Sequence, residues 1–225
     1  MDPAGFLLID KPYEWTSHDV VAKLRGLTKI RRIGHGGTLD PLATGLLVIG
    51  IGRATKGLEA FAQGDKTYLA TVRLGTISTT DDAEGELTEQ TVNELPSETD
   101  IREALVGLVG EQDQLSPAYS ALKTAGKKHY ELARAGRPVP RQPRWITVYS
   151  LEPLKIAYLD VTFRCRVSKG TYIRALARDL GERLGTGGYL AALRRETVGK
   201  FSVTEAVQLS ELATDWQNHL IKFHD

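Results

Sequence analysis

GHGGTLDPLATG, at residues 34–45, is the stretch on which the interpretation of this chain depends. Four glycines surround a single carboxylate, that of Asp40, and a proline follows it directly. Pro41 pushes the backbone of Asp40 toward an extended conformation, while Gly36 and Gly37 allow a large ligand to approach the backbone closely. One interpretation is an ordinary turn, because Asp-Pro and Gly-Gly pairs are common in loops. The alternative is a loop that presents one carboxylate to a ligand.

The length and the amino-acid composition are those of an ordinary globular protein. A chain of 225 residues suffices for one large domain or two small ones, with 41% hydrophobic and 25% charged residues. Cys165 is its one cysteine, so no internal disulfide can form, and we expect a reducing compartment, the cytoplasm. No apolar run approaches the roughly 18 residues that a membrane span needs, so we expect no membrane association.

The charges are distributed unevenly, although the net charge is only +1. Residues 76–100 contain eight acidic side chains and no basic one, whereas residues 121–145 contain seven basic side chains and one acidic. Residues 20–35 contain five basic side chains and no acidic one. A nearly neutral total can therefore hide two positive zones, which either contact a polyanion or are solvated faces.

Hydrophobic periodicity predicts a mixture of strands and helices. Apolar runs or alternation predict strands at residues 5–12, 45–52, 66–75, 145–154, 158–168 and 189–203. Helical spacing and capping residues predict helices at residues 16–28, 53–64, 98–110, 129–136, 171–185 and 209–223. Several neighbouring strands lack an intervening helix, so we expect an α+β fold with mostly antiparallel strands.

Metal and nucleotide-cofactor motifs are weak or missing in the sequence. The five histidines show no paired i,i+4 spacing and have no cysteine nearby, which argues against a catalytic zinc site. VIGIGRATKG at residues 48–57 approaches a dinucleotide fingerprint, with Gly50 and Gly52 correctly spaced, but Thr55 stands where the third glycine belongs. A nucleotide-cofactor enzyme is therefore an alternative, which titration with NAD or ATP would test.

Two further features depart from local rules. Lys169 and Arg174 lie at the start of a predicted helix, where the helix dipole disfavours cations. Arg174 is therefore expected to have an anionic partner, either a carboxylate or a phosphate. Tyrosines also stand beside basic residues in KTY, KKHY and KGTY, a combination that suits stacked bases and phosphates.

Together these stretches resemble the TruB-type tRNA pseudouridine synthases. The blocks occur in the family's order from about residue 5 to 207: LLIDKP, GHGGTLDPLATGLL, DKTYLATVRLG, TTDDAEGE, SPAYSALKTAGKKHYELARAG and SKGTYIRALARDLGERLG. The resemblance implies the pseudouridine synthase fold, a central, mostly antiparallel mixed sheet flanked by helices, with an insertion that grips RNA. It implies isomerisation of a flipped-out uridine in the T loop of tRNA, at position 55, without cofactor or metal. A non-catalytic RNA-binding or tRNA-folding chaperone protein on the same fold is the alternative.

The resemblance assigns roles to individual residues. Asp40 matches the catalytic aspartate, which acts at the sugar or at the base, and Tyr68 matches the tyrosine that stacks on the uracil. Arg174 matches the arginine that pairs with that aspartate and would supply the expected anionic partner. The other predicted substrate-binding positions are His35, which fills the space left by the extracted base, Tyr172 and Leu193 of the hydrophobic wall, Lys11 and Thr38. Asp82 matches an acidic position to which the sequence assigns no role.

The resemblance also suggests how the chain is organised. Residues 1–208 are expected to form the catalytic domain, with an RNA-contacting insertion at about residues 114–144. The expected phosphate contacts of the insertion are Lys123, Lys127, Lys128, Arg137, Arg141 and Arg144. Many family members carry a further RNA-binding (PUA) domain, for which residues 209–225, expected to form a short helix, are too few. The expected partner is the T-arm stem-loop of tRNA, bound by a monomer.

Overall fold

The structure is a computed structural model, and it describes residues 3–92, 94–119, 123–124, 127–128, 143–212 and 215–223. It divides into two compact units, of which the first comprises Met1–Leu69 and Leu193–Asp225 and the second Ala70–Ala192. Two strands, β4 (Lys66–Leu74) and β12 (Gly188–Val198), contribute residues to both units.

The first unit is built on a mixed sheet. Strand β1 (Gly5–Lys11) pairs antiparallel with β3 (Ala43–Ile51) along its whole length, and β12 runs parallel to the start of β3. Four short strands complete this part of the sheet: β2 (Ile33–His35) on β3, β13 (Phe201–Ser202) on β12, and both β14 (Val207–Gln208) and β15 (Ile221–Lys222) on β1. The antiparallel pairs outnumber the parallel ones, as predicted from the sequence.

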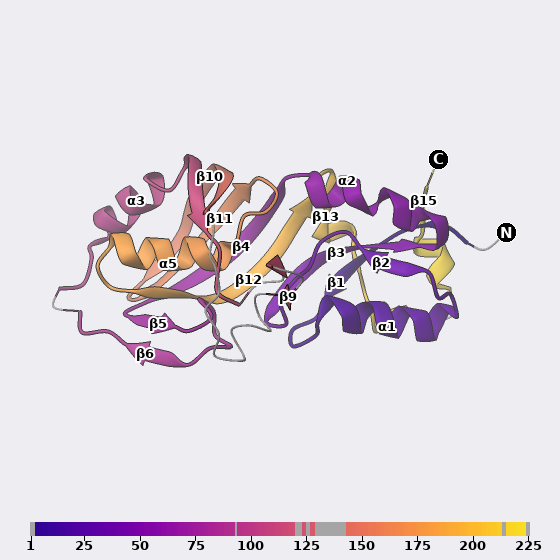
Figure 1. Ribbon diagram of the computed structural model, residues 1–225, viewed down its shortest axis with the longest axis horizontal. Helices are drawn as coiled ribbons and strands as arrows, with labels where there is room; N and C mark the ends of the chain where they lie inside the picture. The colour runs from indigo at the N-terminus through magenta and orange to yellow at the C-terminus, as the bar shows by residue number, and fades with distance from the viewer. Residues whose placement is uncertain are drawn as a thin grey trace. The chain divides into compact units, whose positions relative to one another are not determined.

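Both faces of this sheet are buried, which explains why its central strands are continuous apolar runs. Along β1, Leu7 and Ile9 point to the face covered by helix α1 (Ser17–Thr28). Phe6 and Leu8 point to the other face, where Leu58 of helix α2 (Leu58–Gln63) packs. Figure 1 shows these two helices on opposite sides of β1 and β3.

Helix α1 begins and ends where its sequence predicts. Thr16 accepts a hydrogen bond from the amide of Asp19, whose carboxylate in turn accepts from the amide of Thr16, forming a complete capping box. The helix ends at Lys29, which adopts a left-handed conformation. After β3 the chain forms a 3₁₀-helix at Gly52–Gly57 before α2. The near-fingerprint at residues 48–57 therefore spans the end of β3 and a 3₁₀-helix, not the start of an α-helix.

The second unit contains the strands β4, β11 (Asp160–Val167), β10 (Pro143–Ala157) and β7 (Gly110–Leu115), adjacent in that order. Helices α3 (Glu98–Val106) and α5 (Ile173–Arg183) pack together beside these strands (Figure 1). The acidic stretch forms the predicted hairpin, with β5 (Thr76–Ser78) antiparallel to β6 (Leu87–Glu89). This fixes the turn that carries Asp82.

The predicted insertion emerges from two adjacent strands. β7 and β10 are antiparallel, and their register pairs Gln114 with Arg144 and Leu115 with Pro143. Both ends of the insertion are therefore held side by side by sheet hydrogen bonds. Within it, β8 (Lys123–Thr124) pairs with β9 (Lys127–Lys128). The helix predicted at residues 129–136 lies outside the described residues.

The predicted helix at residues 209–223 is wrong for the part that the structure describes. The described residues form a short 3₁₀-helix, Trp216–His219, followed by β15. A further 3₁₀-helix, Val203–Glu205, precedes β14. Trp216 and Leu212 pack into the core beneath α1, so the apolar pattern marks burial rather than a continuous helix. Within the described ranges, no helix is both long and apolar enough to cross a lipid bilayer.

Candidate active site

Asp40 lies in the loop between β2 and β3 and is half-buried. Its neighbour Leu39 is fixed by Ser17 of α1, whose hydroxyl oxygen accepts from the Leu39 amide (2.8 Å) and donates to the Leu39 carbonyl (3.1 Å). The carbonyl of Asp40 itself accepts from the amide of Ala43 at 3.1 Å. The loop is thus anchored immediately before and after its carboxylate.

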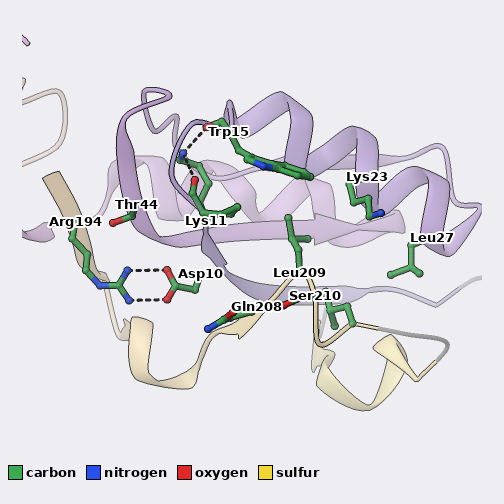
Figure 2. Close-up of a pocket in the computed structure, with 12 residues that line it drawn as sticks. Asp10, Lys11, Trp15, Lys23, Leu27, Thr44, Arg194, Gln208, Leu209 and Ser210 are labelled. Atoms are coloured by element: carbon green, nitrogen blue, oxygen red, sulfur yellow. Dashed lines mark hydrogen bonds and ion pairs between the residues drawn. The ribbon is translucent and has the colours of Figure 1, made fainter. Parts of the chain in front are cut away.

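Lys11 holds the loop on one side of Asp40. Its ammonium is fully buried and donates to the carbonyls of Pro12 (2.9 Å), Trp15 (2.5 Å) and Pro41 (3.1 Å). Figure 2 shows this lysine pointing toward the Trp15 carbonyl. Because a buried cation needs polar partners, Lys11 fixes the peptide of the proline that follows the carboxylate.

Arg195 holds the loop on the other side of Asp40. It is 2% exposed, and its guanidinium donates to the carbonyls of Leu46 (2.8 Å), Thr38 (3.3 Å) and Gly37 (3.1 Å). The planar fork of an arginine suits such a set of fixed acceptors. The sequence analysis missed Arg195, because an arginine in a strand pattern carries no signal for the carbonyls of a distant loop.

A glycine makes this arrangement possible. Gly45 has a φ of +99°, and a Cβ atom at that position would lie 2.3 Å from the carbonyl oxygen of Arg195. The start of β3 can therefore approach β12 closely only without a side chain there. This close approach places the Arg195 guanidinium under the Asp40 loop.

The first unit contains most of the predicted substrate-binding residues. Tyr68 is buried in β4, at 9% exposure, and belongs to the inward-facing set of that strand, as its alternation predicted. Leu193 of β12 is in register with Ala43, and its carbonyl accepts from the hydroxyl of Thr44 at 3.4 Å. Thr38 is exposed in the loop itself.

His35 ends β2 just before the loop. Its ring packs edge-to-face against His18 of α1, with 5.3 Å between ring centroids. Burial lowers the pKa of His35 below its ordinary value of 6.5, and electrostatic interactions with His18 and Arg195 lower it further. A neutral imidazole is therefore favoured beside the loop.

Arg174, in the second unit, has the anionic partner that its helix-start position predicted. Its Nη1 lies 3.3 Å from Oδ2 of Asp82, and both residues are 7% exposed. The guanidinium also donates to the carbonyls of Thr80 (3.1 Å) and Tyr119 (3.0 Å). The pairing expected between Arg174 and Asp40 joins residues of different units and stays a prediction.

Asp82, like Arg174, makes several hydrogen bonds. Its Oδ1 accepts from the Thr80 hydroxyl (2.5 Å) and from the amide of Glu84 (3.0 Å). The Asp82 carboxylate is thus held by three groups, the hydroxyl of Thr80, the amide of Glu84 and the guanidinium of Arg174. The residue whose role the sequence left open is therefore the structural partner of Arg174.

Tyr172 immediately precedes α5 and is half-buried. The side-chain amide of Gln114, itself 2% exposed, binds both polar groups of the Tyr172 main chain. Sequence reasoning treated Gln114 only as the beginning of the insertion, because a glutamine in a strand gives no signal for such a contact.

The predicted phosphate contacts are only partly described. Arg144 is exposed at the start of β10. Lys123, Lys127 and Lys128 lie on the β8–β9 pair, and their side chains are not described. Arg137 and Arg141 lie outside the described residues.

A cavity of about 680 Å³ lies in the first unit, beside the anchors of the Asp40 loop. Lys11 and Thr44 line it at one end, where Arg194 and Asp10 form a two-pronged ion pair at 3.0 and 2.7 Å. Figure 2 shows this pair at one end of the cavity, with α1 on one side and residues 208–210 on the other. Among the described residues, no group of histidine, cysteine or carboxylate side chains is arranged to hold a metal ion.

Sequence comparisons place these features among known proteins. Residues 25–173 match the family described as TruB family pseudouridylate synthase (N terminal domain), and residues 174–222 match the tRNA pseudouridylate synthase B C-terminal domain. A protein of Thermobifida fusca named tRNA pseudouridine synthase B is 46% identical over 220 residues, which cover 94% of this chain and 75% of that protein. A protein of the same name from Opitutus terrae is 46% identical over 212 residues, covering 92% of this chain and 86% of the relative.

Solved structures agree with the sequence comparisons. A chain of the archaeal box H/ACA sRNP Nop10-Cbf5 complex superposes with a TM-score of 0.71 at 30% identity, covering 95% of this chain. A chain of a Cbf5-Nop10-Gar1 complex superposes with a TM-score of 0.73 at 32% identity, covering 92% of this chain. This chain spans about half the length of those two, 54% and 53% respectively.

Proposed function

This chain belongs to the TruB family of pseudouridylate synthases, and we propose that Asp40 is the group through which it acts on a uridine in the T loop of tRNA, at position 55. The reaction class follows from the family: the chain is a tRNA pseudouridine synthase, an isomerase that converts uridine to pseudouridine. The comparisons do not support the alternative of a non-catalytic RNA-binding protein.

The reaction rearranges bonds without adding or removing atoms. The N1–C1′ bond of the uridine breaks, the uracil turns in its pocket, and C5 joins C1′. C5 then loses its proton and N1 gains one, so the product is an isomer of the substrate. In this scheme the carboxylate of Asp40 acts either at C1′ of the sugar or on the base, and the chain's other residues hold the nucleotide in place.

The observation that carries the proposal is the support of the Asp40 loop by two buried cations. Lys11 donates to the carbonyl of Pro41, and Arg195 donates to the carbonyls of Gly37 and Thr38. These contacts fix the backbone on both sides of a half-buried carboxylate before any substrate binds. A preorganised group loses little freedom on binding, which is the condition for efficient positioning catalysis.

The remaining residues of the site have complementary roles. We assign Tyr68 to stacking on the uracil and to the proton transfer from C5. Leu193 and Tyr172 form the apolar wall that keeps water from C1′ while the glycosidic bond is open. Arg174, held by Asp82, pairs with Asp40 in the complex with RNA. His35 occupies the space from which the base is withdrawn.

Extracting the base from the folded T loop costs a few kcal/mol, and contacts to phosphates offset this cost. Arg144 and the cations of the insertion are the proposed contacts. RNA affinity should therefore fall linearly on a log–log plot against salt concentration, and Arg144→Gln should reduce the slope by about 1. A flat salt response would show that these side chains do not contact the phosphates.

Three coarser features belong to the same proposal. Residues 1–208 constitute the catalytic domain, the protein acts as a monomer, and it works in the cytoplasm with tRNA. Light scattering coupled to size-exclusion chromatography measures the mass of the protein in solution. A mass of two chains would contradict the proposal of a monomer.

The decisive experiment replaces Asp40 with asparagine. Asp40→Asn keeps the size of the side chain and removes its charge, so we expect it to abolish pseudouridine formation in a T-arm stem-loop while RNA binding persists. Carbodiimide adducts of the product report turnover, and fluorescence anisotropy reports binding. Asp113→Asn, on an exposed position of β7, is the control and should retain full activity. Turnover by Asp40→Asn would remove Asp40 from the chemistry.

A further inference from the structure

Gln114 makes an unusual use of a buried side-chain amide. Its Oε1 accepts from the main-chain amide of Tyr172 at 2.8 Å, and its Nε2 donates to the main-chain carbonyl of the same residue at 3.0 Å. The side chain is 2% exposed, so water does not compete for these contacts. A single glutamine of β7 therefore satisfies both polar groups of one residue 58 positions away.

This contact fixes the first turn of α5. Tyr172 is the N-cap of that helix, with extended dihedral angles of −98° and 113°, and its side chain does not cap it. The Tyr172 carbonyl also accepts from the amide of Leu176, which closes the first helical turn. Gln114 thus holds the main chain of the N-cap residue itself and helps to set where the helix begins and in which direction it starts.

Two site residues depend on this first turn. Tyr172 is the residue that Gln114 binds, and Arg174 lies two positions later on the same turn. A rotation of the turn would move the tyrosine of the pocket wall and the guanidinium that Asp82 holds. A displacement of about 1 Å in such groups can cost about 100-fold in rate.

The same segment supplies further contacts to α5. The carbonyl of Tyr119 accepts from Arg174 at 3.0 Å, and the carbonyl of Leu115 accepts from Arg178 at 3.0 Å. Residues 114–119 are the root of the insertion, and the other root, at Arg144, pairs with Gln114 in the sheet. The segment that carries the RNA-contacting insertion is therefore hydrogen-bonded to the helix that carries Arg174.

We propose that Gln114 is a positioning residue for the isomerisation: it holds Tyr172 and Arg174 in their working places and ties them to the root of the RNA-contacting insertion. Gln114 does not itself touch the substrate in this scheme. The inference rests on the proposed function, because it concerns the rate of that reaction rather than a separate activity.

The first test compares two glutamines of one strand. Gln112 also lies on β7, two residues away on the same face, and its amide donates to the carbonyl of Leu108 at 2.7 Å. We expect Gln114→Ala to lower the single-turnover rate of pseudouridine formation by about 10- to 100-fold, with the RNA dissociation constant changed by less than about threefold. Gln112→Ala should leave the rate within about twofold of the native protein. Thermal melts of both variants show how much of any loss reflects stability.

The second test uses Gln114→Glu, which also serves if Gln114→Ala does not fold. An ionised glutamate accepts from the Tyr172 amide but cannot donate to its carbonyl, whereas a protonated glutamate does both. The rate of this variant relative to the native protein should therefore rise as the pH falls from 8 to 5.5. The charged neighbours on the packed elements, Arg144 of β10 and Arg174 and Arg178 of α5, are the same in all variants, so the ratio isolates position 114.

The outcomes separate this inference from the proposed function. A native protein that forms no pseudouridine in the T-arm substrate would overturn the proposed function. A native protein that is active, with Gln114→Ala equally active, would overturn only the positioning role. Equal losses in Gln114→Ala and Gln112→Ala that follow their melting temperatures, with no pH-dependent recovery in Gln114→Glu, would show a purely structural role and also overturn it.

Discussion

Arg174 and Asp82 form a buried ion pair, with Nη1 and Oδ2 3.3 Å apart and both side chains about nine-tenths covered. The arginine comes from the first turn of α5 and the aspartate from the turn of the β5–β6 hairpin. A buried arginine at a helix start is unfavourable without such a partner, because both burial and the helix dipole disfavour the cation. The acidic hairpin thus holds the cation at the start of α5.

Removing either charge of this pair should be costly. We expect Asp82→Ala to lower the free energy of unfolding by about 3–5 kcal/mol, because it removes a carboxylate that pairs with a buried guanidinium, and to reduce the rate of pseudouridine formation. Urea unfolding measures the first effect. The exposed pair between Arg102 and Glu98 on α3 is the control, and Glu98→Gln should cost no more than about 0.5 kcal/mol. Equal effects at the two pairs would contradict the role of burial.

Arg195 should be essential to the geometry of the Asp40 loop. Arg195→Met keeps an unbranched side chain but leaves the carbonyls of Gly37, Thr38 and Leu46 without their donor, at about 1–3 kcal/mol for each group that stays buried and unsatisfied. We expect a marked loss of activity as well as of stability. Arg194→Met, at the neighbouring and more exposed position, breaks only the pair with Asp10 and should cost about 1 kcal/mol or less. Full activity of folded Arg195→Met would show that the Asp40 loop keeps its conformation without the contacts of Arg195.

The close approach at Gly45 predicts a contrast between two glycines. Gly45→Ala places a Cβ against the carbonyl of Arg195 and forces a non-glycine residue to a φ of +99°, so it should destabilise by at least about 2 kcal/mol. Gly26→Ala lies on the exposed side of α1 with no atom near the added methyl, and should stabilise by about 0.5–1 kcal/mol. Thermal denaturation of the two variants measures whether each substitution lowers or raises the stability.

The lowered pKa of His35 predicts that acid destabilises the first unit. The folded protein binds this proton less readily than the unfolded chain, whose histidine has a pKa of 6.5, so the stabilisation is present above pH 6.5 and is lost as the pH falls below it. His35→Gln should therefore flatten the decline in unfolding free energy between pH 7.5 and 5.5. His219→Gln, at an exposed histidine, should leave the decline unchanged. Parallel curves for the native protein and His35→Gln would contradict this assignment.

Local sequence signals were sufficient for most of the fold and for the position of the Asp40 loop. The capping residue Thr16, the alternation through Tyr68 and the apolar run of β3 each depend on neighbours within a few positions, so they can be interpreted directly. The same holds for Asp40, whose proline and glycines are adjacent to it. These features were predicted and are present in the structure.

The supports of the site could not be predicted in the same way. Arg195 reaches residues 157 and 158 positions away, Asp82 meets an arginine of a later helix, and Gln114 binds a main chain 58 positions away. Such contacts depend on which strands are neighbours, which periodicity does not specify. The prediction of a helix at residues 209–223 was wrong for a related reason. Leu212 and Trp216 have the spacing of a helix face, but the core that they enter, beneath α1, is formed by distant residues.

The pairing of Leu115 with Pro143 has a consequence for how this enzyme can be modified. Because the two strands already meet as an antiparallel ladder, a tight turn of a few residues could join them in place of the whole intervening segment. Segments of different length and charge could then be exchanged on the same scaffold. A replacement that removes Tyr119 also removes a carbonyl that binds Arg174, so the choice of RNA and the rate of isomerisation would change together.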